Sequence, residues 1–292
     1  MKKWGCEMSK KIIFNIYRYQ ILPQDRIQLS FFDDIKNVDE LIQRKNSIFS
    51  GILSKIESQV LEHRKKPIKF QLKYESDNFF IFKMGIKRYT KIGNEDLEDT
   101  KQDDWRYVFI IFWNKPDKQF LLIQDKSKVF SYPKDALKMI VKFIQKSLLD
   151  KNLIIKSESL FDKNDFWGII NEYPKKVSRV KFTLITPNMA NISGELSQEL
   201  KELFKSTNSI ENTLEISAAK ESILHLEQSN NIVQNVVDYA SEGGGSAQIK
   251  IKGIRKTFST TDKIKTIEID EINITNPNQE TIDIMKNLLE NQ

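Results

Sequence analysis

The chain has 292 residues, which is enough for one large domain or two of ordinary size. Apolar residues make up 39% of it and charged residues 29%, and this apolar content, with 18 Phe, excludes a wholly disordered chain. A single cysteine, Cys6, excludes an internal disulfide and a multi-cysteine metal site, and no apolar run approaches the roughly 20 residues of a membrane-spanning helix. The basic start lacks the apolar stretch of a signal peptide, so we expect a soluble cytoplasmic protein.

The first half is predicted to contain strands, where β-branched and aromatic residues run together, and helices, where apolar residues recur at helical spacing. In chain order these are a strand over 12–19, a helix from 37 to 64, strands over 68–74, 79–89, 106–113 and 119–124, and a helix over 133–149. Asn37 is a typical helix N-cap. The acidic segment 95–104 is predicted to be a mobile loop, and 114–118 a hairpin turn.

The second half again mixes strands with helices. We predict a strand over 176–186, a helix over 193–205, a strand over 213–218, a helix over 231–239, a hairpin of strands 249–258 and 263–274, and a helix over 279–289. Strands joined by short turns pair antiparallel, so the predicted fold class is α+β, with antiparallel sheets packed against helices. We predict two such units, over residues 1–155 and 156–292.

The charge is distributed unevenly between these two units. Residues 1–155 hold 30 Lys and Arg against 20 Asp and Glu, a net charge of +10, whereas residues 156–292 hold 16 against 20, a net charge of −4. A basic unit attracts polyanions such as RNA or DNA, and an acidic one is suited to a protein partner or to self-association. The alternative is that lysine serves here only as a solubilising surface residue.

Two groups of basic residues are candidates for binding nucleic acid. In the predicted C-terminal hairpin, Lys250 lies opposite Asp270 and Lys252 opposite Glu268, which leaves four cations near the turn without a partner. Three further lysines recur every four residues along the 133–149 helix, where a solvated helix face is the alternative. The candidate nucleic-acid-binding residues are Arg255, Lys256, Lys263, Lys265, Lys138, Lys142 and Lys146.

No recognisable catalytic, metal or cofactor site is present in the sequence. His63 is predicted at a helix end and His225 in a strand or turn, and neither has a catalytic context. The glycines at 243–245 follow a helix, which predicts a helix cap and a flexible connector and not a phosphate loop. The aromatic strand over 106–113 lacks the glycine of RNA-recognition sheets and has aromatics on both faces, so it is predicted to be core. The Glu-x-Lys at 199–201 lies in a predicted helix, unlike the strand-borne motif of metal-dependent nucleases.

Three segments carry a resemblance to a known family. The opening strand over 12–18, the helical segment over 44–51 and the tail that runs from the glycines to the basic hairpin are similar to an uncharacterised bacterial family whose members occur among anti-phage defence genes. The resemblance implies a defence role and supplies no catalytic residues. The sequence therefore favours a non-enzymatic nucleic-acid-binding or sensing component of bacterial defence. The alternatives are a metal-dependent nuclease whose carboxylates converge only in the fold, and a protein-interaction or assembly subunit.

Overall fold

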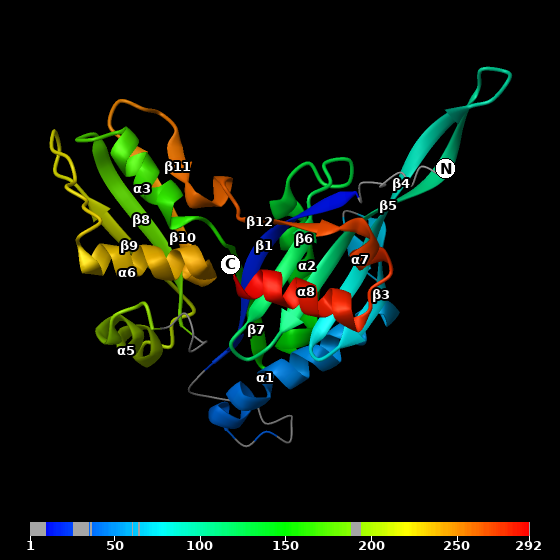
Figure 1. Cartoon of the computed structure of the whole chain (residues 1–292), viewed down its shortest axis with the longest axis horizontal. Helices are drawn as coiled ribbons and strands as arrows, with labels where there is room; N and C mark the ends of the chain where they lie inside the picture. The colour runs from blue at the N-terminus through cyan, green and yellow to red at the C-terminus, as the bar shows by residue number, and fades with distance from the viewer. Residues whose placement is uncertain are drawn as a thin grey trace, which may run out of the picture.

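The computed structural model describes residues 10–25, 35, 37–59, 61–63, 65–187 and 194–291. Within these ranges the chain has the predicted α+β fold, with an eight-stranded and a four-stranded antiparallel sheet, each packed against helices (Figure 1). Cys6, Arg64 at the predicted end of the first helix and Ser193 at the predicted start of another lie outside the described residues.

The larger sheet is built around a long first strand and has the order β12-β1-β6-β5-β4-β3-β2, with β7 also paired to β1. Its strands are β1 (Lys11–Pro23), β2 (Leu61–His63), β3 (Lys66–Ser76), β4 (Phe79–Gly93), β5 (Asp99–Asn114), β6 (Gln119–Gln124), β7 (Leu153–Ser159) and β12 (Thr266–Asp270). β1 pairs with β12 through 11–15 and with β7 through 17–23. Every pairing is antiparallel, including those of β1 with β6, β7 and β12, which are distant from it in the sequence.

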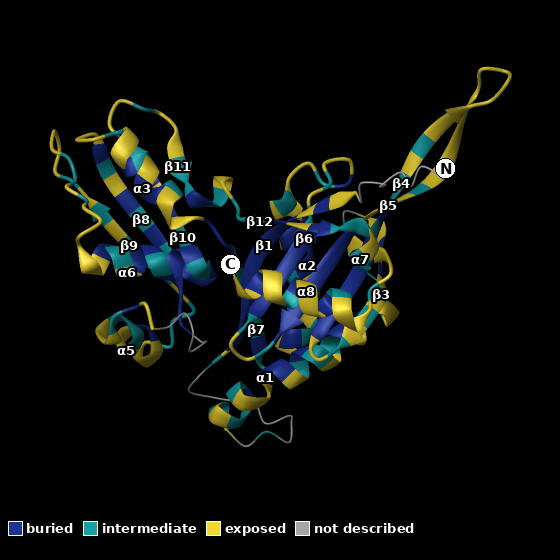
Figure 2. Ribbon diagram, in the orientation of Figure 1, coloured by how far each residue is buried: buried dark blue, intermediate teal, exposed yellow. Residues whose placement is uncertain are grey.

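Helices cover both faces of the larger sheet. On one face α1 (Val38–Leu53) and α2 (Pro133–Leu149) bury residues such as Phe49 and Ile140 against the strands. On the other face α8 (Gln279–Glu290) packs Ile282 and Met285 against the strands, close to the short helix α7 (Glu271–Thr275). Because both faces are covered there, the central strands are buried on both sides, and 108–113 of β5 are all buried as predicted (Figure 2).

The smaller sheet has the order β11-β10-β8-β9, packs against helices of its own and lies to the left of the larger sheet in the view of Figure 1. Its elements are α3 (Lys163–Glu172), β8 (Val177–Ile185), α5 (Gln198–Ser206), β9 (Glu211–Ser217), α6 (Asn231–Tyr239), β10 (Gly245–Ile251) and β11 (Thr257–Ser259). Phe166 and Trp167 of α3 and Val237 of α6 fill the core of this sheet.

The two sheets do not divide the chain at residue 155. β7 continues to Ser159 within the larger sheet, and β12, α7 and α8 return to that sheet after the smaller one is complete. The predicted second unit of 156–292 therefore contributes its last strand and last two helices to the first unit. The pairing of β12 with β1 joins residues more than 250 positions apart, which local patterns do not reveal.

Two other predictions for the first unit were wrong in extent. The first helix ends at Leu53, where the Ser54 hydroxyl donates to the Ser50 carbonyl oxygen at 3.0 Å, and the chain continues through a 3-10 turn into β2. His63 therefore lies in a strand, paired with Lys66, and not at a helix end. The acidic segment 95–104 is a loop only as far as residue 98, because Asp99–Asn114 forms β5.

The residues at 243–245 are buried and do not form a flexible connector. Gly243 and Gly244 end a π-helical turn, η2 (Ala240–Gly244), and Gly245 begins β10. Gly243 has a φ of 83°, a conformation that favours glycine. A Cβ at Gly243 would lie 2.4 Å from the Cβ of Arg18, and one at Gly245 would lie 2.2 Å from the Thr183 carbonyl oxygen. The glycines are needed because the backbone passes this close to β1 and β8, where the two sheets meet.

Candidate nucleic-acid interface

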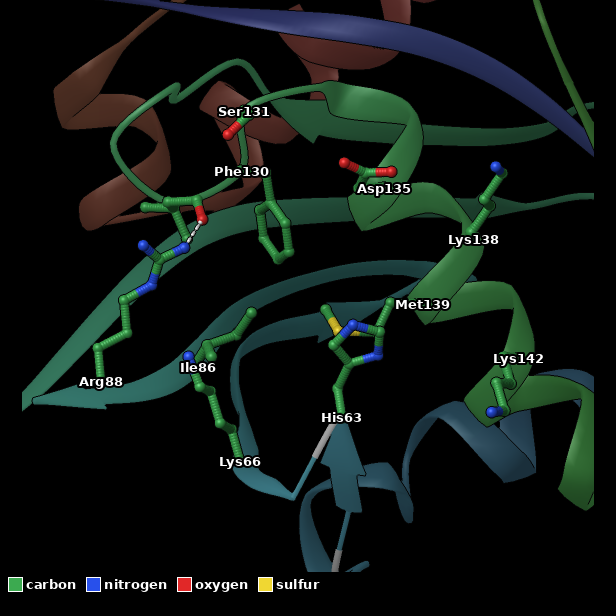
Figure 3. A pocket seen from close by; sticks show the side chains of 11 residues that line it. His63, Lys66, Ile86, Arg88, Phe130, Ser131, Asp135, Lys138, Met139 and Lys142 are labelled. Atoms are coloured by element: carbon green, nitrogen blue, oxygen red, sulfur yellow. Dashed lines mark hydrogen bonds between the residues drawn. The ribbon is translucent and has the colours of Figure 1, made fainter.

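A cavity lined by basic side chains lies beside the first half of α2, on the sheet face that α1 and α2 cover (Figure 3). Its volume is about 420 Å³, within the range of ligand-binding clefts. Ile86 and Met139 provide apolar lining. The basic side chains that line this site, called the basic cavity below, are His63 of β2, Lys66 of β3, Arg88 of β4, and Lys138 and Lys142 of α2.

Helical spacing explains why α2 contributes two lysines to the basic cavity. Leu137, Ile140 and Ile144 are buried against the sheet, and Lys138 and Lys142 lie one turn apart on an exposed side of the helix. Lys146, one turn further on, is exposed but is not among the residues that line the cavity. The predicted lysine stripe is therefore present, and two of its three members border this cavity.

The positive charge of the basic cavity is poorly compensated. Asp135 is the one carboxylate among its lining residues. Within the described ranges, Lys66, Lys138 and Lys142 form no ion pair. Arg88 donates from Nη2 to the Val129 carbonyl oxygen, which orients its guanidinium toward the loop after β6. Such a group of cations is suited to a ligand that carries several negative charges, such as successive phosphates.

Sequence reasoning missed three members of the basic cavity. His63, Lys66 and Arg88 come from three different strands, and no local pattern brings them together with α2. The pairing of β2 with β3 and of β3 with β4 is what places them at one end of the sheet. The only signal in the sequence was the general excess of cations in residues 1–155.

The predicted C-terminal hairpin is wrong in its pairing. β10 pairs instead with β11, which sets Lys250 opposite Thr257, and β12 leaves this sheet to pair with β1. Lys250 donates from Nζ to the carbonyl oxygens of Ile254 and Arg255, each at 2.7 Å. Lys252 pairs with Glu221 at 2.8 Å.

The four cations predicted to be free at the hairpin turn are separated. Lys263 pairs with Asp165 at 2.7 Å, and this hydrogen bond raises the pKa of Lys263. Arg255 and Lys256 are exposed beside the smaller sheet, and Lys265 donates its backbone N–H to the Leu160 carbonyl oxygen where the sheets meet. None of these four lines the basic cavity, so the seven candidate residues do not form one surface.

The opposite face of the larger sheet carries a second group of cations, here combined with aromatic rings. Trp105 and Tyr107 of β5 are each 37% exposed, and lysines from neighbouring segments lie over them. The Nζ of Lys69 is 4.9 Å from the Trp105 ring centroid, and those of Lys83 and Lys126 are 4.6 Å and 4.3 Å from the Tyr107 ring centroid. We call these five residues the aromatic–lysine face.

The prediction that the aromatic strand over 106–113 is core is therefore correct only for 108–113. The alternation of Trp105 and Tyr107 with the charged Asp104 and Arg106 was the available signal, because a period of two marks a strand with one face toward solvent. Arg106 itself is neutralised by Asp104, with Nε to Oδ2 at 2.6 Å. The pKa of Asp104 is lowered, chiefly by this hydrogen bond.

A third site is a cavity of about 310 Å³ where the two sheets meet. It is lined from the larger sheet by Tyr17 and Glu158 and from the smaller one by Ser246 and Gln248. Burial raises the pKa of Glu158 to about 7, so this carboxyl can hold a proton near neutral pH. The Tyr17 hydroxyl is buried without a hydrogen-bond partner in the described structure.

Within the described residues, no three His, Cys, Asp or Glu side chains lie close enough together to hold a metal ion. No helix in the described ranges combines the length and the apolar character needed to cross a bilayer. Searches against family models, curated proteins and solved structures find no significant match for this chain.

Proposed function

We propose that this chain is a non-enzymatic nucleic-acid-binding or sensing component of a bacterial anti-phage defence system, and that the basic cavity binds backbone phosphates. The observation that carries the proposal is the convergence of Lys66, Arg88, Lys138 and Lys142, from β3, β4 and α2, around one cavity with a single carboxylate. The defence role rests on the resemblance of the 12–18 and 44–51 segments and of the glycine-to-hairpin tail to a bacterial family whose members occur among anti-phage defence genes.

The electrostatics of the basic cavity favour a polyanion over a single small anion. Four formal positive charges spread over a cavity of about 420 Å³ exceed what one phosphate needs, and a nucleic-acid backbone presents a charge at each nucleotide. Like charges held on one helix face repel one another by a few tenths of a kcal/mol at the spacing of Lys138 and Lys142. Neutralisation by phosphates would relieve that repulsion and release counterions, so binding would weaken as salt rises.

The test compares two double variants that change the net charge equally. We measure binding of the full chain to labelled RNA and DNA oligonucleotides by fluorescence anisotropy between 50 and 300 mM salt. In Lys138→Gln/Lys142→Gln we expect the slope of log K against log salt to become less negative by about two, because two lysine–phosphate contacts are lost. In the control, Lys146→Gln/Lys256→Gln, both sites are exposed and lie outside the basic cavity, so its salt dependence should stay close to that of the wild type.

Three results would overturn the proposal or part of it. If the wild type binds no oligonucleotide even at 50 mM salt, the nucleic-acid role is wrong. If both double variants lose the same affinity, net charge alone governs binding and the basic cavity is not the site. If the wild type cleaves the oligonucleotide with Mg²⁺, the chain is a nuclease and the non-enzymatic assignment is wrong.

A further inference from the structure

The aromatic–lysine face lies on the part of the larger sheet that α8 leaves open. On this face α8 covers Phe79 and Trp113, together with the strand residues around them. Further along β5, toward the β4–β5 hairpin, no described helix covers Trp105 and Tyr107, and both rings are more than a third exposed. The β4–β5 ribbon projects from the body of the molecule beyond them (Figure 1).

The backbone beneath Trp105 is suited to holding its ring along the sheet. The position nearest the ring on β4 is Gly85, and a Cβ there would lie 3.4 Å from Cε3 of Trp105. The Trp105 ring therefore lies beside Gly85 at about van der Waals distance from the position of a Cβ, a cross-strand arrangement that orients an aromatic over a glycine. Tyr107 lies opposite Gly85 in the β4–β5 register.

From this geometry we infer that the aromatic–lysine face stacks unpaired bases, and that the nucleic acid bound by this chain is single-stranded. This inference rests on the proposed function and names its ligand class. Residues i and i+2 of an antiparallel strand are about 6.8 Å apart, twice the 3.4 Å rise of a stacked duplex step. Trp105 and Tyr107 therefore match bases that are separated from one another, and bases in a duplex have no free face to offer.

Charge complementarity supports a nucleic acid as the occupant of this face. Lys69, Lys83 and Lys126 hold their ammonium groups within 5 Å of the ring centroids, where they would lie next to the phosphates of a stacked strand. Among the described residues none of these three forms an ion pair. Flexible lysine side chains can move off the rings when bases arrive, because an exposed cation–π contact contributes only about 0.5–1 kcal/mol.

The aromatic–lysine face and the basic cavity are connected around one edge of the sheet. Lys126, Lys128 and Val129 follow β6 and line a shallow depression together with Trp105 and Tyr107. Val129 also lines the basic cavity. A strand whose bases stack on Trp105 and Tyr107 can therefore pass over this loop and place its next phosphates at the basic cavity.

The test uses 12-nucleotide single-stranded RNA and DNA of one base type and the matched 12-base-pair duplexes. The variant Trp105→Leu/Tyr107→Leu keeps apolar bulk and charge but removes both aromatic faces, and Trp105→Phe/Tyr107→Phe restores them. We expect the wild type to bind single strands more tightly than duplexes. The leucine variant should lose about 10- to 100-fold in affinity for single strands and little for duplexes, and the phenylalanine variant should stay within about threefold of the wild type.

A second measurement does not depend on the leucine variant folding. Stacking of a base on an indole quenches its fluorescence, so single strands should quench the wild type more than they quench Trp105→Phe, which retains the other three tryptophans. Equal quenching in the two proteins, or a wild type that prefers duplexes, would overturn the inference. In either case, binding that still depends on Lys138 and Lys142 would leave the proposed function standing. A wild type that binds no oligonucleotide would overturn both the proposed function and this inference.

Discussion

Arg18 and Glu242 form an ion pair across the place where the two sheets meet, with Nη2 to Oε2 at 3.5 Å, and the two residues differ sharply in their access to solvent. The side chain of Arg18 is 3% exposed, whereas that of Glu242 is 37% exposed. The Arg18 guanidinium also lies 4.6 Å above the Phe120 ring centroid. Burial lowers the pKa of Arg18, and Glu242 opposes that effect by stabilising the charged form.

Because Arg18 is buried and Glu242 is exposed, neutralising Glu242 should destabilise the folded chain more than neutralising Arg18. Glu242→Gln leaves a buried guanidinium without its counter-charge and should lower the free energy of unfolding by about 3 kcal/mol. Arg18→Met keeps volume over Phe120 and leaves only a water-accessible carboxylate, so its cost should stay near 1 kcal/mol. Urea unfolding of both variants checks the order. A larger loss in Arg18→Met than in Glu242→Gln would mean that the arginine acts through contacts other than this pair.

The close approach at Gly245 predicts a steric cost that does not come from backbone strain. Gly245 has a φ of 169°, which any residue can adopt, but a Cβ there would lie 2.2 Å from the Thr183 carbonyl oxygen in the paired strand. Gly245→Ala should therefore destabilise by about 2 kcal/mol or more, because the β8–β10 pairing must shift.

The matched control for that substitution is Gly168→Ala. Gly168 lies in helix α3 with nothing within 4 Å of an added Cβ, so alanine should stabilise by about 0.5–1 kcal/mol. The two variants should shift the thermal midpoint in opposite directions. Equal shifts would show that position 245 tolerates a side chain and that the glycine there is not required by packing.

The raised pKa of Glu158 predicts a pH dependence of stability. In the folded chain the pKa of this carboxyl is raised to about 7, chiefly by burial, and by Glu211, while Lys134 and Lys156 act in the opposite direction. The folded state therefore binds more protons than the unfolded state between about pH 4.3 and 7, so this group lowers stability as pH rises through that window.

Glu158→Gln removes this dependence because the amide is isosteric with the protonated acid. At pH 8 the variant should be more stable than the wild type by about 3 kcal/mol, and below about pH 3.5, where the acid is protonated in both states, the two should be equal. Unfolding free energies measured at several pH values give the difference directly, since contributions from other groups cancel. A difference that does not change with pH would show that Glu158 ionises normally in the folded chain.

Sequence patterns located the elements with strong local signals. The helix predicted over 133–149 and the strand over 119–124 have those bounds in the structure, and the helix over 231–239 is also confirmed. β7 and α3, which lie between the predicted elements 133–149 and 176–186, were not predicted. The pairing of the last strand was wrong because a strand of alternating residues is compatible with more than one edge.

Only part of the candidate site could be predicted from the sequence. Lys138 and Lys142 were recognised because four-residue spacing places them on one helix face. Arg255, Lys256, Lys263 and Lys265 were grouped with them through a hairpin that does not form. His63, Lys66 and Arg88 escaped notice although they border the same cavity as the two lysines.

Residue order alone was thus enough to establish an α+β chain with a basic first half, since hydrophobic periodicity acts between neighbours a few positions apart. It was also enough to show which side of α2 is polar. The packing of distant segments decided three further features. These are the strands that pair with β1, the burial of the three glycines, and the grouping of cations from β3, β4 and α2. Those arrangements are set by the edges and faces that remain to be covered once each element has formed, and a linear pattern carries little information about them.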